Sequence, residues 1–372
     1  MKLSLPLYTS IAVLLAVYHG HSQETPVVLP EMTVTATADP SPGASLTVPS
    51  VEEAAAELAE VPGGVALIEA EQYKRGRAAT LKDSLDFAPG VYVQPRFGAE
   101  ESRISIRGSG IQRTFHGRGI RLLQDGVPLN LADGSFDFQA IEPLSTRYIE
   151  VYRGGNALEF GSSTLGGAVN FVSHTGHSAS PLTARFGIGS FETYHAQLSS
   201  GMVIGPFDYY ISLTHFSTDG FREHSQQNTQ RLFANFGYRL SPEWETRFFL
   251  TYVQSDSELP GGLTKAELED DPRQAQRNPF FVPVDVVLSN WKRDYELFRI
   301  ANKTTWQSGE HRLQLTTFWS WKDLDHPILF WIDQLSNDLG LNLRYDNTAE
   351  LFGHRNHFII GFSPTYGTVE DN

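Results

Sequence analysis

The chain has 372 residues, of which 40% are hydrophobic and 19% are charged, and its formal net charge is −14. This composition is too apolar for a disordered chain and too polar for a bundle of membrane-spanning helices. The acidic balance argues against nucleic-acid binding, and the absence of cysteine excludes disulfides and zinc sites built on thiolates.

Residues 1–22 have the pattern of a secretory signal peptide. Lys2 gives a positive start, residues 11–17 form an apolar core, and the small residues Gly20 and Ser22 precede the expected cleavage site. A short membrane anchor is the alternative, but the apolar run is shorter than the roughly 20 residues that a spanning helix needs. A membrane protein without long apolar helices is left with a closed barrel.

Residues 23–49 form a linker rich in Pro, Thr, Ala and Ser. It contains a short β-prone segment made of Glu31, Met32, Thr33, Val34, Thr35, Ala36 and Thr37. Such a segment can add itself as a strand to the sheet edge of a partner protein. An ordinary disordered linker is the open alternative.

Residues 50–178 are expected to form a compact α+β unit. Ser50 and Glu53 form a capping box ahead of an alanine-rich helix that ends at the Pro-Gly-Gly of residues 62–64. A second helix is expected at 79–87, and short strands at 65–68, 91–93, 104–106 and 122–123. Asp125 and Gly126 predict a hairpin turn, since both residues tolerate positive φ.

The pattern changes to long alternating strands after residue 179. In one of them every second residue is apolar: Leu232, Ala234, Phe236, Tyr238 and Leu240. A period of two over ten or more residues puts one face in lipid and the other in water. A soluble sandwich is the alternative, but its strands usually run only about five or six residues.

The connections between these strands alternate in length. Short turns are expected near 205–206, 241–243, 308–310 and 352–354, and longer connections at 219–227, 257–292 and 325–337, apart from a tight turn near 189–190. This alternation is typical of outer-membrane barrels, which have short periplasmic turns and long external loops. We expect nine strands between residues 182 and 369.

Four stretches resemble the plug of TonB-dependent outer-membrane receptors in sequence and in order. They are LKDSLDFAPGVYVQ (81–94), SRISIRG (102–108), LLQDGVPLN (122–130) and YIEVYRGGNALEFGSSTLGGAVNFVS (148–173). The resemblance implies an α+β plug domain at 50–178, followed at 179–372 by the N-terminal part of an antiparallel transmembrane β-barrel. It also implies that Glu31 to Ala36 form the TonB box, which binds TonB of the ExbB–ExbD complex.

The resemblance assigns roles to several charged residues. Arg107 and Arg153 correspond to arginines that pair with acidic residues on the barrel wall, and Glu150 is assigned to the same plug–barrel lock. Ligand is expected at the outward tips near 94–101, 109–119 and 129–138. The candidate ligand-binding residues there are Arg96, Arg113, Phe115, His116 and Arg118, because arginine donates to the carboxylates of an anionic chelate. Solvated loop arginines are the alternative.

The expected function is TonB-dependent uptake of a ferric siderophore or ferric citrate across the outer membrane. The loop LPGGLT (259–264) resembles the ferric-citrate branch, but the signalling domain common there is not expected, because only about eight residues separate the signal peptide from the TonB box. The alternatives are cobalamin, a sugar, another metal chelate, or a surface binding protein that transports nothing. No catalytic residue, cofactor or metal site is predicted, since the Gly-rich stretch lacks a phosphate-loop lysine and no HExxH occurs.

Nine strands are too few for a closed barrel around a plug. Plugged outer-membrane transporters have about 22 strands, and barrel diameter grows with strand number. The chain is therefore expected to be incomplete, with an open sheet whose first and ninth strands do not pair.

Overall fold

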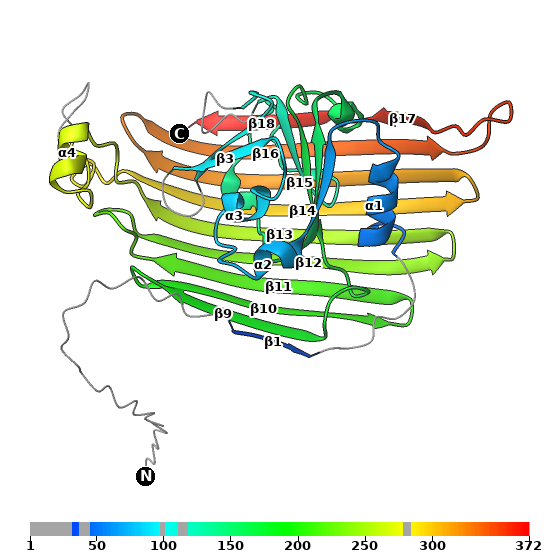
Figure 1. Ribbon diagram of the computed structural model, residues 1–372, viewed down its shortest axis with the longest axis horizontal. Helices are drawn as coiled ribbons and strands as arrows, with labels where there is room; N and C mark the ends of the chain where they lie inside the picture. The colour runs from blue at the N-terminus through cyan, green and yellow to red at the C-terminus, as the bar shows by residue number, and fades with distance from the viewer. Residues whose placement is uncertain (1–31, 37–44, 97–100, 111–117, 278–283, 372) are drawn as a thin grey trace, which may run out of the picture.

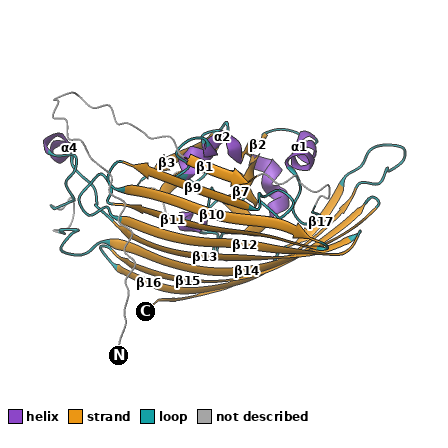
Figure 2. Ribbon diagram, turned by 90° about the horizontal axis from the view of Figure 1, so that it is seen from below, coloured by secondary structure: helices purple, strands orange, loops and turns teal. Residues whose placement is uncertain are grey.

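A small α+β unit lies against one face of a broad sheet of long strands (Figure 1). The computed structural model describes residues 32–36, 45–96, 101–110, 118–277 and 284–371. Viewed along the sheet, the long strands curve beneath the helices of the small unit (Figure 2). Within the described residues, no helix is long and apolar enough to cross a membrane.

The small unit is built on a mixed five-stranded sheet in the order β2-β7-β8-β5-β6, in which β5 and β8 are parallel. A separate hairpin pairs β3 with β4. The elements are α1 (Val51–Ala59), β2 (Val65–Glu69), α2 (Ala70–Lys74), α3 (Leu81–Leu85), β3 (Val91–Pro95), β4 (Ser102–Ile106), β5 (Ile120–Gln124), β6 (Val127–Pro128), η1 (Phe138–Ala140), β7 (Thr146–Arg153), η2 (Gly154–Phe160) and β8 (Gly167–Ser173).

Local sequence signals in this unit are confirmed. The Ser50 Oγ accepts the Glu53 N–H at 3.1 Å while the Glu53 carboxylate accepts the Ser50 N–H at 2.8 Å, which is the expected capping box. Asp125 and Gly126 have φ of +54° and +76° in the tight turn between β5 and β6. The five-residue α2 was not predicted, because it has no capping side chain and is too short to show helical periodicity.

The large sheet is antiparallel, and its strands follow chain order. They are β1 (Met32–Ala36), β9 (Leu182–Gly189), β10 (Thr193–Ile204), β11 (Phe207–Thr218), β12 (Gln227–Ser241), β13 (Trp244–Glu258), β14 (Lys292–Ser308), β15 (His311–Pro327), β16 (Trp331–Asn347), β17 (Phe358–Phe362) and β18 (Thr365–Asp371). The connection between β13 and β14 carries α4 (Lys265–Asp270).

β17 and β18 occupy one strand position, because both pair with β16 and only Ser363 and Pro364 separate them. Proline has no N–H to donate to a ladder, so it interrupts the strand. Counted in this way, the described residues contain the nine barrel positions expected from the sequence. The sheet is open, as predicted: β9 pairs with β1 and β10, and β18 pairs only with β16.

The expected long connection at 325–337 is wrong. β15 continues to Pro327 and β16 begins at Trp331, so only three residues turn the chain. The aspartates at 323, 325 and 333 resemble loop residues, but they alternate with the buried Leu324 and His326. The strands therefore continue past their apolar band, with polar side chains on the outer face.

The core is shared between the two parts of the molecule. One buried cluster joins Ile149 and Phe171 of the small unit to Val253, Tyr295 and Leu324 of the large sheet. A second cluster packs the other face of the small unit against Phe233, Phe249 and Phe318. Side chains on the opposite face of the long strands, such as Phe248, are exposed. The small unit therefore covers the inward face of the sheet.

Removing the helix cap of α1 should loosen the first turn of that helix. We expect Ser50→Ala to cost about 1 kcal/mol, the usual value of such a cap. Hydrogen exchange of a peptide covering residues 51–59 should then be faster than in the wild type. Ser50→Asp, which keeps an acceptor oxygen at the cap, is the matched control and should exchange at the wild-type rate. Equal exchange in the two variants would contradict the role of the capping box.

Candidate functional site

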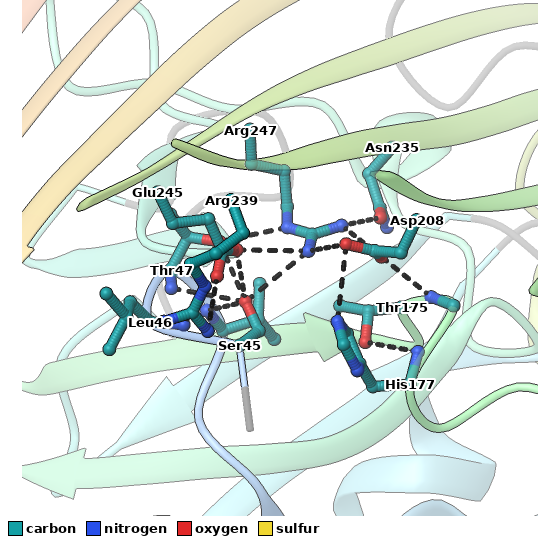
Figure 3. Close-up of polar contacts among 12 residues, drawn as sticks. Ser45, Leu46, Thr47, Thr175, His177, Asp208, Asn235, Arg239, Glu245 and Arg247 are labelled. Carbon is teal, nitrogen blue, oxygen red and sulfur yellow. Dashed lines mark hydrogen bonds and ion pairs between the residues drawn. The ribbon is translucent and has the colours of Figure 1, made fainter. Parts of the chain in front are cut away.

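A buried polar cluster joins the N-terminal segment to the large sheet (Figure 3). At its centre the Arg247 side chain is fully buried. Its two terminal nitrogens donate to the two carboxylate oxygens of Asp208 at 2.9 and 2.6 Å, and Nη1 also donates to Asn235 Oδ1 at 2.7 Å. A forked pair of this kind fixes the orientation of both side chains.

Glu245 and Arg239 complete the charged part of this cluster. Glu245 lies 3.1 Å from Arg247 and 3.1 Å from Arg239, measured between the nearest nitrogen and oxygen atoms. We call Asp208, Asn235, Arg239, Glu245 and Arg247 the wall cluster, since all five lie on β11, β12 and β13. Its two arginines and two carboxylates balance in charge.

Residues 45–47 dock on the wall cluster through neutral groups. The hydroxyls of Ser45 and Thr47 each donate to Glu245 Oε1 at 2.6 Å, and the Leu46 N–H donates to Oε2 at 2.8 Å. Arg247 Nε donates to Thr47 Oγ1 at 2.9 Å. The segment can thus leave without separating any ion pair of the wall cluster.

A glycine makes the Arg247–Asp208 pair possible. Asp208, Gly237 and Arg247 are direct cross-strand neighbours on β11, β12 and β13. A Cβ at Gly237 would lie 2.2 Å from both Arg247 Nη2 and Asp208 Oδ2. Only a residue without a side chain lets the guanidinium cross the middle strand.

Lys303 of β14 links residues 45–47 to the sheet of the small unit. Its ammonium donates to the Thr47 carbonyl at 3.4 Å and to the Asp125 carbonyl in the turn between β5 and β6. Arg299 lies four residues earlier on the same face of β14 and donates to Pro128 O and to Gln124 Oε1, both at 3.1 Å. The β5–β6 turn is therefore fixed to β14 on both sides.

A charged contact holds the opposite end of the small unit. Asp137 pairs with Arg293 and lies 3.2 Å from Lys322, and Glu101 lies 3.4 Å from Arg293. Burial would raise the pKa of Asp137, but Lys322 and Arg293 outweigh it and hold the pKa below its ordinary value. Arg293 and Lys322 lie where β14 begins and β15 ends, at the end of the sheet that carries the long connection with α4 between β13 and β14.

Three of the predicted ligand-binding residues, Arg113, Phe115 and His116, lie outside the described residues. Arg118 pairs with Asp133 at 3.2 Å, and both side chains are largely exposed. Arg96 is exposed, partial desolvation lowers the pKa of its guanidinium, and its backbone N–H donates to Glu101 O at 2.8 Å. The ligand-binding assignment of these five residues therefore stays a prediction.

The three predicted lock residues lie within the small unit. Arg153 donates to the carbonyls of Pro89 and, at 2.9 Å, of Val65. Arg107, at φ +53°, lies with its guanidinium against Gly64 and Gly154. Glu150 accepts from Asn170 at 2.8 Å, and burial raises its pKa to about 7. The expected pairing with a barrel wall stays a prediction.

The predicted TonB box lies at the edge of the large sheet. Within the described residues Met32–Ala36 form β1, which pairs antiparallel with β9. In this register Val34 is the cross-strand partner of Ala184. Glu31 and Thr37 lie outside the described residues. The segment thus adopts the extended backbone that strand addition requires.

The wall cluster was not predicted from the sequence. One signal for it exists: Glu245 and Arg247 stand two residues apart at the start of β13, so both project to the same face of the strand. Charges on a face that otherwise carries Phe249 and Val253 need partners. The position of Ser45 and Thr47, about 200 residues earlier in the chain, has no such signal.

Comparison with known proteins identifies the small unit. Residues 57–168 match the TonB-dependent Receptor Plug Domain family. The chain is 25% identical over 222 residues to the vitamin B12 transporter BtuB of Vibrio vulnificus (strain CMCP6), which covers 55% of this chain and 34% of that protein.

Two solved structures share the whole arrangement. The ferric citrate transporter FecA in the unliganded form superposes with a TM-score of 0.68 at 18% identity, covering 84% of this chain and 50% of that one. The ferric yersiniabactin uptake receptor FyuA of Yersinia pestis gives 0.65 at 14% identity, covering 82% and 48%. The chain spans about half the length of these structures. The predicted fold class, a plug followed by antiparallel barrel strands, is confirmed, and residues 57–168 match the plug of the predicted family.

Filling the space at Gly237 should break the Arg247–Asp208 pair. Disrupting a buried ion pair usually costs about 3–5 kcal/mol, so Gly237→Ala should lower the thermal unfolding temperature of the protein in detergent. Gly187→Ala on β9 is the matched control, because a Cβ there meets nothing closer than 3.8 Å. Equal unfolding temperatures for the two variants would show that the pair does not depend on this glycine.

Proposed function

We propose that this TonB-dependent receptor, with its plug and barrel strands, imports a ferric siderophore or ferric citrate across the outer membrane, and that TonB with ExbB–ExbD drives the import. Residues 1–22 would direct export, residues 23–49 would contact TonB, residues 50–178 would form the plug, and residues 179–372 would lie in outer-membrane lipid as the first part of the barrel.

The observation that carries this proposal is the orientation of the plug relative to the two ends of the large sheet. Residues 45–47 contact the start of β13, at the end of the sheet with short turns. Asp137 and Glu101 contact Arg293 at the other end, where the long connections lie. In outer-membrane barrels the short turns are periplasmic. The TonB-binding segment would then face the periplasm, and the plug tips would face the outside.

The docking of residues 45–47 suits a segment that must be withdrawn. Each of these hydrogen bonds joins a neutral group of the segment to a charged side chain and contributes about 1.5–3 kcal/mol net, and water can replace it when the segment leaves. The wall cluster keeps its ion pairs throughout, since Arg247 stays bonded to Asp208 and Arg239 stays close to Glu245. We infer that this contact sets how readily the TonB box is released.

An anionic iron chelate is the ligand that the plug tips fit best. Arg96, Arg113 and Arg118 are carried by predicted outward tips, and guanidinium groups bind carboxylates through paired donors. Structural relatives that transport ferric citrate and ferric yersiniabactin support this ligand class. Cobalamin is the second candidate, because the sequence relative from Vibrio vulnificus is a vitamin B12 transporter. Calorimetric titration with ferric citrate and with cyanocobalamin separates the two.

Blocking strand addition at the TonB box should uncouple uptake from binding. Proline at position 34 lacks the N–H that a β-ladder needs, so Val34→Pro should abolish import of radiolabelled ferric chelate by cells. Binding of the chelate to energy-depleted cells should be unchanged. Val34→Ala, which keeps the N–H, is the control and should import normally. Import by the proline variant would refute the TonB-box assignment.

Removing the tip arginines should weaken ligand binding. A charge-assisted hydrogen bond is worth about 1.5–3 kcal/mol, so Arg113→Ala with Arg118→Ala should lower affinity for ferric citrate at least tenfold by calorimetry. Arg273→Ala, at an exposed loop arginine that is not assigned to the ligand, serves as the control. An unchanged affinity in the double variant would place the ligand elsewhere.

A further inference from the structure

Arg121 is a buried cation in the middle of the plug. It lies on β5, where only 9% of its surface is exposed. Its chain neighbours Ile120 and Leu122 enter the core on one face of the plug sheet. Because side chains alternate along a strand, Arg121 projects to the other face, together with Leu123.

No protein group balances this charge within the described residues. The Arg121 Nε is enclosed and has no hydrogen-bond partner there, and no ion pair of the side chain is found. Burial alone lowers the pKa of Arg121, with no carboxylate acting in the opposite direction. An uncompensated buried charge is costly, so a site of this kind calls for an anion. Arg247, whose side chain is fully buried, shows the ordinary solution, with Asp208 as its partner.

Three carboxylates of the plug and one of β16 have hydrogen-bond or ion-pair partners other than Arg121. Glu159 pairs with Arg344 at 2.6 Å, Asp338 accepts the Ala132 N–H at 2.8 Å, and Asp133 accepts the Ser135 hydroxyl at 2.6 Å. Glu150 accepts from Asn170. Within the described residues, none of these four carboxylates forms an ion pair with Arg121.

The strand neighbours of Arg121 are a small residue and an aromatic one. Its direct cross-strand neighbour on β8 is the small Ala168, and the next on β7 is Tyr152. The loop before β8 lies alongside, since the Gly166 N–H donates to the Gly119 carbonyl at 2.8 Å. Leu165 in that loop is 88% exposed. The backbone of Arg121 thus lies beside this loop.

This face of the plug is turned toward the short-turn end of the sheet. Leu58 of α1 belongs to the same buried cluster as Leu123 and Ala168. The neighbouring Glu57 pairs with Arg312 at the start of β15, 3.3 Å away. The opposite face packs on Tyr295 and Leu324, near the long connections. A ligand entering among the tips would reach Arg121 only after passing the plug sheet.

We propose that Arg121 is an anion-binding subsite inside the plug that takes a carboxylate group of the transported chelate on the periplasmic side of the plug sheet. The proposal rests on the proposed function for the identity of the ligand. The guanidinium fork offers two parallel donors, which match the two oxygens of a carboxylate. The missing counter-charge is then supplied by the ligand during transport.

The test compares thermal unfolding of the purified protein in detergent with and without citrate. In the wild type, citrate should raise the unfolding temperature, because it binds the folded state. Arg121→Met removes the charge at similar volume and should unfold at or above the wild-type temperature without citrate. Its apparent affinity for citrate should fall at least tenfold. Arg121→Lys should keep part of the citrate effect, and Arg355→Met, at an exposed pair with Glu60, should keep all of it.

Three results overturn the proposal. They are an absence of stabilisation by citrate in the wild type, an equal citrate effect in Arg121→Met, and a citrate-free Arg121→Met that is less stable than the Arg355→Met control. The last result would indicate that a carboxylate of the protein itself is the ion-pair partner of Arg121. The measurement needs neither TonB nor uptake, so its failure leaves the Val34→Pro experiment untouched, and a failure of uptake leaves the anion subsite standing.

Discussion

The long strands have two unlike faces, and this constraint governs the rest of the molecule. One face is apolar and exposed, as at Phe248 and Ile300, while the other carries charged groups that are buried, such as Arg247, Arg293 and Lys303. A buried charge must find a partner. The plug, lying on the inward face, provides partners such as Asp137 and the Asp125 carbonyl, so plug and sheet stabilise each other.

The two ends of this contact differ in kind. At the short-turn end the linker provides hydroxyls and an N–H, and the sheet keeps its own charges paired. At the other end Asp137 of the plug is itself one partner of the ion pairs with Arg293 and Lys322. Withdrawing residues 45–47 replaces the hydrogen bonds of neutral groups with water and leaves the ion pairs of the sheet intact, whereas withdrawing Asp137 would leave a buried carboxylate and two cations without partners. The plug segment that carries Asp137 is therefore bound to the sheet more firmly than residues 45–47 are.

Arg121 departs from this pattern, because it is buried without a counter-charge in the described part of the chain. Natural proteins usually break a packing rule where function requires it. In the proposed import the ligand passes the plug sheet, and a cation without a partner attracts an anionic ligand more strongly than one already paired. Arg247 differs from Arg121 in this respect, because Asp208 of the wall cluster balances its charge.

The sequence by itself determined the elements whose cause is local. The capping box at Ser50, the Asp125–Gly126 turn and the alternation along β12 all depend on neighbours in the chain, so the plug, the strands and their open arrangement were predictable. A polar strand end resembles a loop locally, which explains the wrong connection at 325–337. Only the tertiary structure decided which side chains meet. Thr47 reaches Glu245 and Lys303, which lie 198 and 256 residues later in the chain, and Asp208 reaches Arg247 across Gly237, because strand register and plug position bring them together. Register follows from the pairing of whole strands, and no short stretch of sequence contains it.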